Sequence, residues 1–507
     1  MNICKNLFIE SKKHKHRFTL LILIGTILAE MFFIYGNYHS KAGMKDGWLI
    51  LFYSFPLMNT LFLPIVIAGL SSRLMDIEHK GDMLKSLYTF STPKKIFYTK
   101  YLYGTLSIVF LMIIQGISIY VNAHMLDFKT EFPIKYTFIL EFNTFVTCMT
   151  LFTIHMILSF FIKSQAVSIS VGIVGSFIGL FSAYLPQSIF QKLLPWGTFT
   201  TSLFIGYDWD RETRETSWYL MEPDFSSAFV CIGWIIILTI VTMFLLKNAA
   251  VEEHEHKSQS NGKTRNIFLH KRPVEILKLK GSPAWIAFFV VPVISAVIGT
   301  FNYTSNLEIL TEGWKSLWTQ HTLFLCYFFM PIIIGLFVGC IWRIEHNGTN
   351  MNILMTHRKP IQLILSKYVA TCFITTLSII WIIVVYIVSG LIIHMNTPLP
   401  SEMIMWVLMG TLGAYVICSF QIFAALIIRN FILPIIIAFL GSMAGLFCMS
   451  KKHPYLTPYS LFDIALDQNG TKDINVGHFV VSSVLFIAFF LLISVIYLSK
   501  TDTKTHE

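Results

Sequence analysis

The sequence predicts an all-α integral membrane protein with about twelve transmembrane helices, arranged as two six-helix repeats of the same orientation. Its composition is the first observation behind this prediction, because 55% of the 507 residues are hydrophobic and only 13% are charged. Soluble globular proteins carry roughly 25% charged residues. The second observation is that the apolar residues gather in blocks of the ~20 residues that a helix needs to cross a bilayer. The third is an internal repeat.

The apolar blocks place the individual spans, because Lys, Arg, Asp and Glu lie mostly between the blocks. The first block is followed at once by a second and has no small-residue cleavage site, so it is a span rather than a removed signal peptide. Alternating strands of a β-barrel are not seen. The predicted spans are 18–38, 47–71, 99–121, 137–162, 166–184, 225–246, 283–301, 320–341, 368–394, 403–428, 430–448 and 477–498.

The distribution of charge predicts the orientation of these spans. With the N-terminus in the cytoplasm, most of the 38 Lys and Arg residues fall on the cytoplasmic side, as the positive-inside rule requires. Both termini are therefore expected in the cytoplasm. The net charge of +10 indicates contact with anionic lipid headgroups rather than with nucleic acid. Lys12, Lys13, Lys15 and Arg17, beside Phe8 and Ile9, predict an interfacial helix before the first span.

The two halves are copies of each other. An offset of 267 residues aligns polar and special residues that chance rarely matches: Glu78 with Glu345, His79 with His346, Gly81 with Gly348, Pro93 with Pro360, and Lys100 with Lys367. Six spans per half is an even number, so the repeats are parallel, unlike the inverted repeats of several secondary transporters. We expect a first repeat over 1–246, a cytoplasmic linker over 247–273 and a second repeat over 274–507.

The first cytoplasmic loop of each half has the strongest repeat. Gly81 and Gly348 suit the left-handed position after a helix, and Asp82 and Thr349 are good N-caps. A short amphipathic helix, which includes Leu84, should follow and end near Pro93 or Pro360. Such a helix, continuous with the second span, could transmit movement from a soluble motor. It could also be a re-entry elbow at the headgroups. The residues predicted to act here are Glu78, His79, Gly81, Asp82, Leu84, Pro93, Glu345, His346, Gly348, Thr349 and Pro360.

This pattern resembles the ABC-2 type transporter permeases, and within them the group associated with lantibiotic protection and peptide export. In that family a six-span unit has Glu-x-x-Gly after its second span, a short coupling helix, and then Pro and Lys before the third span. The family usually supplies one unit per chain, whereas this chain has two. The resemblance implies a bacterial plasma-membrane exporter of antimicrobial or other amphipathic peptides. It also implies a separate ABC ATPase, in two copies, that docks on the two loops.

The chain itself has no recognisable nucleotide site. Gly262-Lys263-Thr264 is the only GK[ST] sequence, and Lys257 stands where a P-loop needs its first Gly. The chain is therefore predicted to be no enzyme and to bind no cofactor, with ATP and Mg²⁺ bound by the partner ATPase. No metal site is predicted: His254-Glu255-His256 reads as solvated linker. The eight Cys residues form no CxxC pair, which predicts neither a zinc site nor a disulfide framework.

Three polar residues inside predicted spans are candidates for a substrate path. Glu30 lies within the first span, where an ionisable side chain is costly and suggests function. It could bind a cationic substrate, couple protons or pair with a neighbouring helix. His155 and Gln421 occupy matching places in the two halves, and interhelical hydrogen bonding is the alternative role for both.

Other function classes compete with the permease. An ion-coupled secondary transporter with two six-helix halves is the main alternative, and Glu30 is its support. A membrane-embedded enzyme would need paired catalytic groups at one depth, and the sequence shows only isolated histidines. A sensor or scaffold stays open. The direction of transport and the identity of the substrate follow from the resemblance alone.

Overall fold

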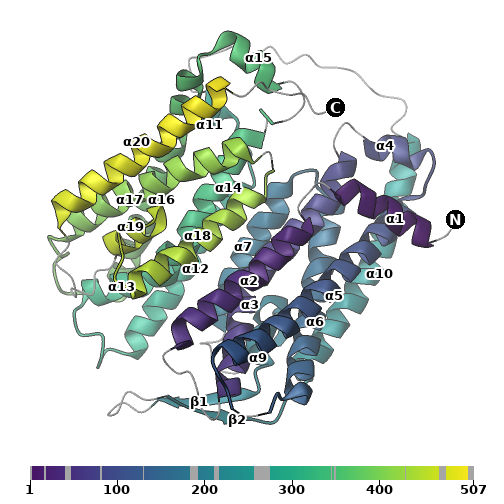
Figure 1. Cartoon of the computed structure of the whole chain (residues 1–507), viewed down its shortest axis with the longest axis horizontal. Coiled ribbons are helices and arrows are strands. Elements are labelled where there is room, and N and C mark those ends of the chain that lie inside the picture. The colour runs from purple at the N-terminus through teal and green to yellow at the C-terminus, as the bar shows by residue number, and fades with distance from the viewer. Residues whose placement is uncertain are drawn as a thin grey trace. The chain divides into compact units, whose positions relative to one another are not determined.

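A computed structural model of the chain describes residues 3–15, 19–39, 47–79, 83–129, 131–182, 192–209, 216–255, 274–343, 345–346, 350–428, 430–466 and 475–500 (Figure 1). The chain divides into two compact units, Met1–Phe268 and Leu269–Glu507. The predicted linker begins inside a helix, because the last helix of unit 1 continues to Glu255.

Unit 1 is built around six long helices, joined by short helices and one β-hairpin. Its elements are α1 (Ile3–His14), α2 (Thr19–Tyr38), α3 (Gly47–His79), α4 (Met83–Tyr88), α5 (Pro93–Met125), α6 (Ile134–Phe161), α7 (Gln165–Ser182), η3 (Pro195–Gly197), α9 (Thr198–Thr201), β1 (Ile205–Trp209), β2 (Thr216–Leu220) and α10 (Ser226–Glu255).

Unit 2 repeats this order, with a broken second span and with one helix, α19, where unit 1 has η3 and α9. Its elements are α11 (Val274–Leu277), α12 (Ala284–Ser305), α13 (Trp314–Phe324), the π-helical turn η5 (Leu325–Phe329), α14 (Met330–Arg343), α15 (Asn350–His357), α16 (Pro360–Ile392), α17 (Met403–Ile427), α18 (Leu433–Ser450), α19 (Pro458–Leu466) and α20 (Val476–Lys500). Segments α13, η5 and α14 together form the second span. The π-helical turn η5 interrupts the regular α-helix just before Pro331.

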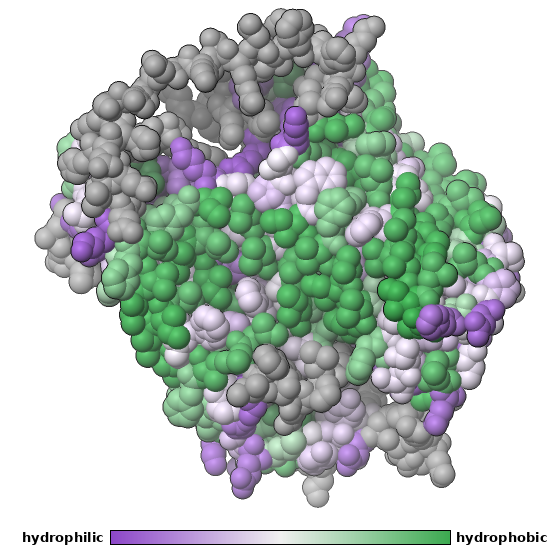
Figure 2. Space-filling model, turned by 180° about the vertical axis from the view of Figure 1, so that it is seen from behind, coloured by the Kyte–Doolittle hydropathy of each residue, from purple (hydrophilic) through white to green (hydrophobic). Residues whose placement is uncertain are grey.

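The twelve predicted spans are confirmed, since the structure has twelve helices long and apolar enough to cross a membrane. In each unit the second span is the most buried and the sixth span the most exposed. The exposed faces of the sixth spans are apolar: Phe229 and Phe244 on α10, and Leu485 and Leu492 on α20, are each more than half exposed. Such faces suit contact with lipid chains, and Figure 2 shows broad hydrophobic areas on the face of the molecule that it draws.

Small residues allow close packing at corresponding places of the two units. On α7, a side chain at Gly175 would collide with the Trp196 ring, and on α18 a side chain at Gly441 would collide with the Tyr459 ring. The segment after the fifth span is therefore held against that span in both units. This contact explains why Gly175 and Gly441 recur in the two halves.

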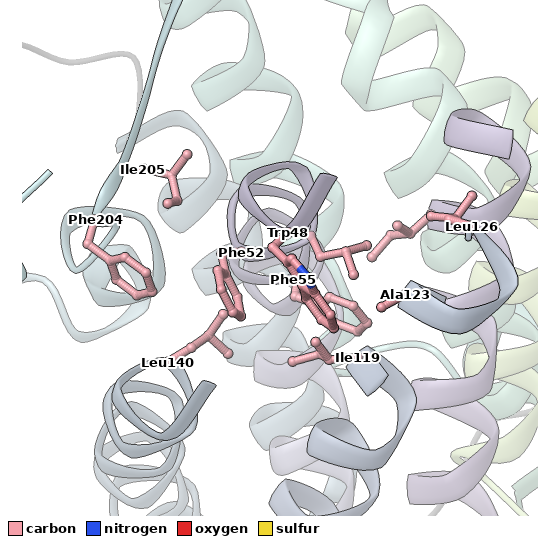
Figure 3. Packing of buried hydrophobic residues seen from close by; sticks show 11 residues of the cluster. Trp48, Phe52, Phe55, Ile119, Ala123, Leu126, Leu140, Phe204 and Ile205 are labelled. Carbon is pink, nitrogen blue, oxygen red and sulfur yellow. The ribbon is translucent and has the colours of Figure 1, made fainter. Parts of the chain in front are cut away.

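The β-hairpin of unit 1 was not predicted. Strands β1 and β2 pair antiparallel, with Tyr207 opposite Trp218, and Phe204 and Ile205 enter a buried cluster with Trp48, Phe52 and Phe55 at the start of α3 (Figure 3). Helix α3 begins at this cluster and ends next to α4. We therefore call the two ends of unit 1 the hairpin end and the α4 end.

Candidate functional site

At the α4 end of unit 1, two carboxylates and two lysines form one buried network. Lys100 Nζ lies 3.0 Å from Glu10 Oε2 and 2.9 Å from Glu78 Oε1. Lys13 Nζ lies 2.7 Å from Glu78 Oε1 and 3.0 Å from Glu10 Oε1. Glu78 and Lys100 are fully buried. The four charges balance, and both the buried Lys100 and the partly exposed Lys13 have carboxylate partners.

Unit 2 contains the same network built from the corresponding elements. Lys367 Nζ lies 2.9 Å from Glu345 Oε1 and 3.3 Å from Glu275 Oε2. Lys278 pairs with Glu275 at 2.7 Å and also with Glu345. Lys367 is fully buried, and Glu345 is 1% exposed. Unit 2 adds one contact, since Lys367 Nζ lies 4.4 Å from the centre of the Trp342 ring, a cation–π arrangement.

Each network joins three elements that are separate in sequence. In unit 1, Glu10 and Lys13 lie one turn apart on α1, Glu78 is the penultimate residue of α3, and Lys100 lies two turns into α5. The helix before the first span, the end of the second span and the start of the third span are thus fixed together. Removing one member of a buried ion pair typically costs ~3–5 kcal/mol, because the remaining charge stays buried.

In both units a histidine joins the end of the second span, next to the network, to a fourth element. His79 Nε2 lies 2.9 Å from the carbonyl oxygen of Ser159, near the end of α6. His346 Nε2 lies 2.8 Å from the carbonyl oxygen of Ala425, near the end of α17. Both contacts join the end of the second span to the end of the fourth span.

The surroundings of three network members outside the spans, Lys13, Lys278 and Glu345, favour their charged forms. Burial acts to lower the pKa of Lys13, but hydrogen bonds and attraction from Glu78 and Glu10 raise that pKa above its ordinary value. Lys278 behaves in the same way with Glu275 and Glu345, and its pKa is also raised. Burial acts to raise the pKa of Glu345, but attraction and hydrogen bonds from Lys367 and Lys278 lower that pKa overall. Lys13, Lys278 and Glu345 are therefore ionised near neutral pH.

The short helices expected after the second spans are present as α4 and α15. Pro93 and Pro360 open α5 and α16, where a missing N–H costs nothing, and the Thr92 side chain caps α5 through Lys95 N–H. Leu84 is half-buried on α4. The predicted positions Gly81, Asp82, Gly348 and Thr349 lie outside the residues that the structure describes.

The three intramembrane candidates lie apart from the networks. His155 Nδ1 lies 3.0 Å from Ser168 Oγ on α7, and the Gln421 amide hydrogen-bonds the Tyr459 hydroxyl at 2.6 Å. Both side chains are fully buried and join neighbouring elements, as expected of interhelical hydrogen bonds. Glu30 is fully buried on α2, and its carboxyl oxygens accept no hydrogen bond from the described residues.

Sequence reasoning missed half of each network. Glu10 and Lys13 belong to a segment interpreted as a lipid anchor, and Glu275 and Lys278 belong to the expected start of the second repeat. A signal existed, because Glu-x-x-Lys occurs at 10–13 and again at 275–278, an offset of 265 residues. The Glu-x-x-Lys pattern belongs to the networks because Lys100 and Lys367 lie next to it in space, and the sequence does not show that proximity.

Comparison with known proteins supports this duplicated arrangement. The family model of the ABC-2 family transporter protein matches residues 7–179 and again 273–445. Each match includes one complete network and one short helix after the second span. No curated protein matches the chain. Proteins of this family are membrane-spanning permeases of ABC transporters, which work with an ABC ATPase. With two fused permease units covering more than half of its length, the chain belongs to the ABC-2 transporter family.

Proposed function

We propose that this chain exports hydrophobic or amphipathic peptides, including antimicrobial peptides, and that a separate ABC ATPase drives it through α4 and α15. The observation that supports this proposal is the duplicated network at the base of both short helices. A force applied to α4 or α15 reaches the second span directly, and the network passes it to the third span and to the preceding helix. His79 and His346 pass it to the fourth span.

The surface of α4 and the turn after it suits a protein partner. Phe90, next to the exposed Thr89, is 87% exposed, and Met83 is 49% exposed. Aromatic and Met side chains are enriched at the centres of protein interfaces. On α15, Asn350 and Thr356 are exposed. We infer that each short helix meets one of two ATPase copies, which bind ATP and Mg²⁺ on the cytoplasmic side. Both termini then lie in the cytoplasm of a bacterial cell.

ATP hydrolysis by the reconstituted complex tests this function. The chain is placed in liposomes with its candidate ATPase, and hydrolysis is measured with and without an amphipathic peptide. We expect peptide-stimulated hydrolysis that needs both proteins, and its loss in Glu78→Gln plus Glu345→Gln. Lys452→Met, at an exposed site just after α18 and outside both networks, is the control and should retain stimulation.

Two results would contradict the proposal. One is a chain that binds no ATPase and moves peptide down an ion gradient. The other is a complex whose peptide stimulation is unchanged in the double variant although the variant assembles normally. The second result would place coupling outside the networks while leaving the family assignment intact.

A further inference from the structure

A layer of buried polar side chains crosses unit 1 directly beneath the cluster of Figure 3. That cluster includes Ile34 of α2, Phe55 of α3 and Ile119 of α5. Residues four apart share one face of a helix. Glu30 therefore lies one turn, ~5.4 Å, from Ile34. Asn59 and Gln115 have the same relation to Phe55 and Ile119. Helices α2 and α5 run toward the hairpin end, and α3 runs away from it. All three polar residues therefore lie on the side of the cluster that faces the α4 end.

The polar layer has more hydrogen-bonding capacity than its own members use. Gln115 Nε2 donates to Asn59 Oδ1 at 2.8 Å, but Gln115 Oε1 and Asn59 Nδ2 have no partner among the described residues. Glu30, Asn59 and Gln115 are all fully buried. An acceptor such as Gln115 Oε1 is costly to leave unpaired away from water. Gln115 Oε1 therefore lacks a hydrogen-bond donor among the described residues. This is a first indication that a ligand supplies the donor, and it does not depend on the carboxyl groups.

A second carboxyl group belongs to the same region. Glu141 follows the cluster residue Leu140 on α6 and interacts electrostatically with Glu30. Both oxygens of each carboxyl are buried without a hydrogen-bond partner among the described residues. The sequence offers no cation to neutralise them, because 19–38, 47–72, 101–125 and 136–161 contain no Lys or Arg. Two unpaired acids in the membrane interior indicate function.

Unit 2 does not repeat this layer residue by residue. The offset of 267 residues replaces Asn59 by Cys326 and Gln115 by Ile382, the offset of 266 that matches His155 with Gln421 replaces Glu141 by Val407, and the offset of 265 of the preceding helix replaces Glu30 by Ser295. Ser295 is satisfied by the carbonyl oxygen of His321, and the buried acid of unit 2, Asp463, lies on α19 and interacts electrostatically with Cys326. The carboxyl pair and the amide pair of unit 1 therefore have no counterpart pairs in unit 2, and a ligand explains them better than the packing of a six-helix unit does.

We propose that Glu30, Glu141 and the Asn59–Gln115 pair form an intramembrane binding site for an ammonium or guanidinium group of the transported compound. These cationic groups donate several hydrogen bonds and accept none, which matches a site with two carboxyls and a free amide oxygen. Charge-assisted hydrogen bonds of this kind are about twice as strong as neutral ones. The cluster of Figure 3 closes the layer toward the hairpin end. This inference rests on the proposed function and names the chemistry of its cargo.

The test compares two versions of one amphipathic fluorescent peptide, with free lysines or with acetylated, neutral lysines. Direct binding to the purified full chain is measured by fluorescence anisotropy, without the ATPase. We expect the lysine peptide to bind about tenfold tighter than the acetylated one. Glu30→Gln plus Glu141→Gln should remove this difference and leave the acetylated peptide unaffected. Glu308→Gln plus Glu402→Gln, at two exposed glutamates of unit 2, is the matched control and should keep the difference.

Each alternative outcome is decisive. If the lysine peptide binds wild type and the double variant equally well, the site is overturned, whether or not an ATPase couples to the chain. If Na⁺ or K⁺ in place of choline abolishes the preference through Glu30 and Glu141, the ligand is an alkali cation and the ammonium assignment is wrong. If binding behaves as expected but no ATPase stimulation occurs, the site stands and the proposed energy source fails.

Discussion

The two units agree at one end and differ in the middle. Glu10, Lys13, Glu78 and Lys100 in unit 1 have counterparts in unit 2 with the same pairing and nearly the same burial. The carboxyl pair and the amide pair around Glu30 have no such counterparts. A task that both units perform, such as responding to one ATPase copy each, requires the same residues in both. A binding site on the transport path needs to exist once. Under the two proposals above, the difference separates residues that transmit movement from residues that meet cargo.

The largest effect is expected from the buried lysines. Lys100→Met leaves Glu10 and Glu78 with only Lys13, and Lys367→Met leaves Glu275 and Glu345 with only Lys278. Each change should destabilise its unit by ~3–5 kcal/mol, because a carboxylate loses its buried partner. Thermal unfolding followed by intrinsic fluorescence should show similar drops for both variants. Lys452→Met should change little. A large drop in one unit and none in the other would break the equivalence of the two networks.

A double replacement separates stability from coupling. Glu78→Met plus Lys100→Met removes one positive and one negative charge and leaves Glu10 paired with Lys13. We expect the melting temperature to recover most of the loss caused by Lys100→Met, since apolar replacement of a whole buried pair is often neutral. Peptide-stimulated ATP hydrolysis should stay low. Recovery of both properties would mean that the network serves stability alone.

The histidine contacts should have a smaller and equal effect. His79→Ala and His346→Ala each remove one hydrogen bond to a carbonyl at the end of the fourth span, worth about 1 kcal/mol. Their melting temperatures should fall by similar small amounts. His124→Ala, which removes an exposed contact to Tyr120, should fall less. Equal losses for all three variants would show that the fourth-span contact has no special role.

The smallest effect is expected from the pH dependence of the melting temperature, which should be alike in the two units. The lowered pKa of Glu345 makes its contribution to stability present above about 4.5 and lost as the pH falls through the lower folded value. The raised pKa values of Lys13 and Lys278 make their contributions present below 10.5 and lost as the pH rises through the folded values. These three groups should therefore add no pH dependence to the melting temperature between those limits. A step near pH 7 would require another titrating group.

Much of the fold follows from the sequence because bilayer thickness and backbone hydrogen bonding leave few alternatives. Runs of ~20 apolar residues identified the twelve spans, and Glu78, Gly81 and Pro93 identified the repeat. Pro93 and Pro360 were predicted only to end the short helices; they open α5 and α16, which begin before the predicted spans 99–121 and 368–394. The hairpin escaped prediction because Ile205–Trp209 and Thr216–Leu220 are short strands within a segment interpreted only as an outer loop.

The site was only half predictable, for a physical reason. Glu78 and Glu345 stand in a repeated motif, whereas Glu10 joins Lys100 across a separation of 90 residues. Nothing in local periodicity reports that contact. Glu30 was recognised because a carboxyl is rare inside a span, but Glu141 was overlooked. Only the packing of α2, α3, α5 and α6 brings Glu141, Asn59 and Gln115 into one layer with it.

Site-specific photo-crosslinking tests the central claim most directly, namely that both units contact the ATPase through equivalent short helices. A photoreactive residue is placed at Ser86 on α4 or at Thr356 on α15, both exposed, and at Tyr219 in the hairpin as a control. In membranes that also contain the ATPase, we predict crosslinks to the ATPase from Ser86 and Thr356 and none from Tyr219. Crosslinks from only one short helix, or from neither, would contradict the account.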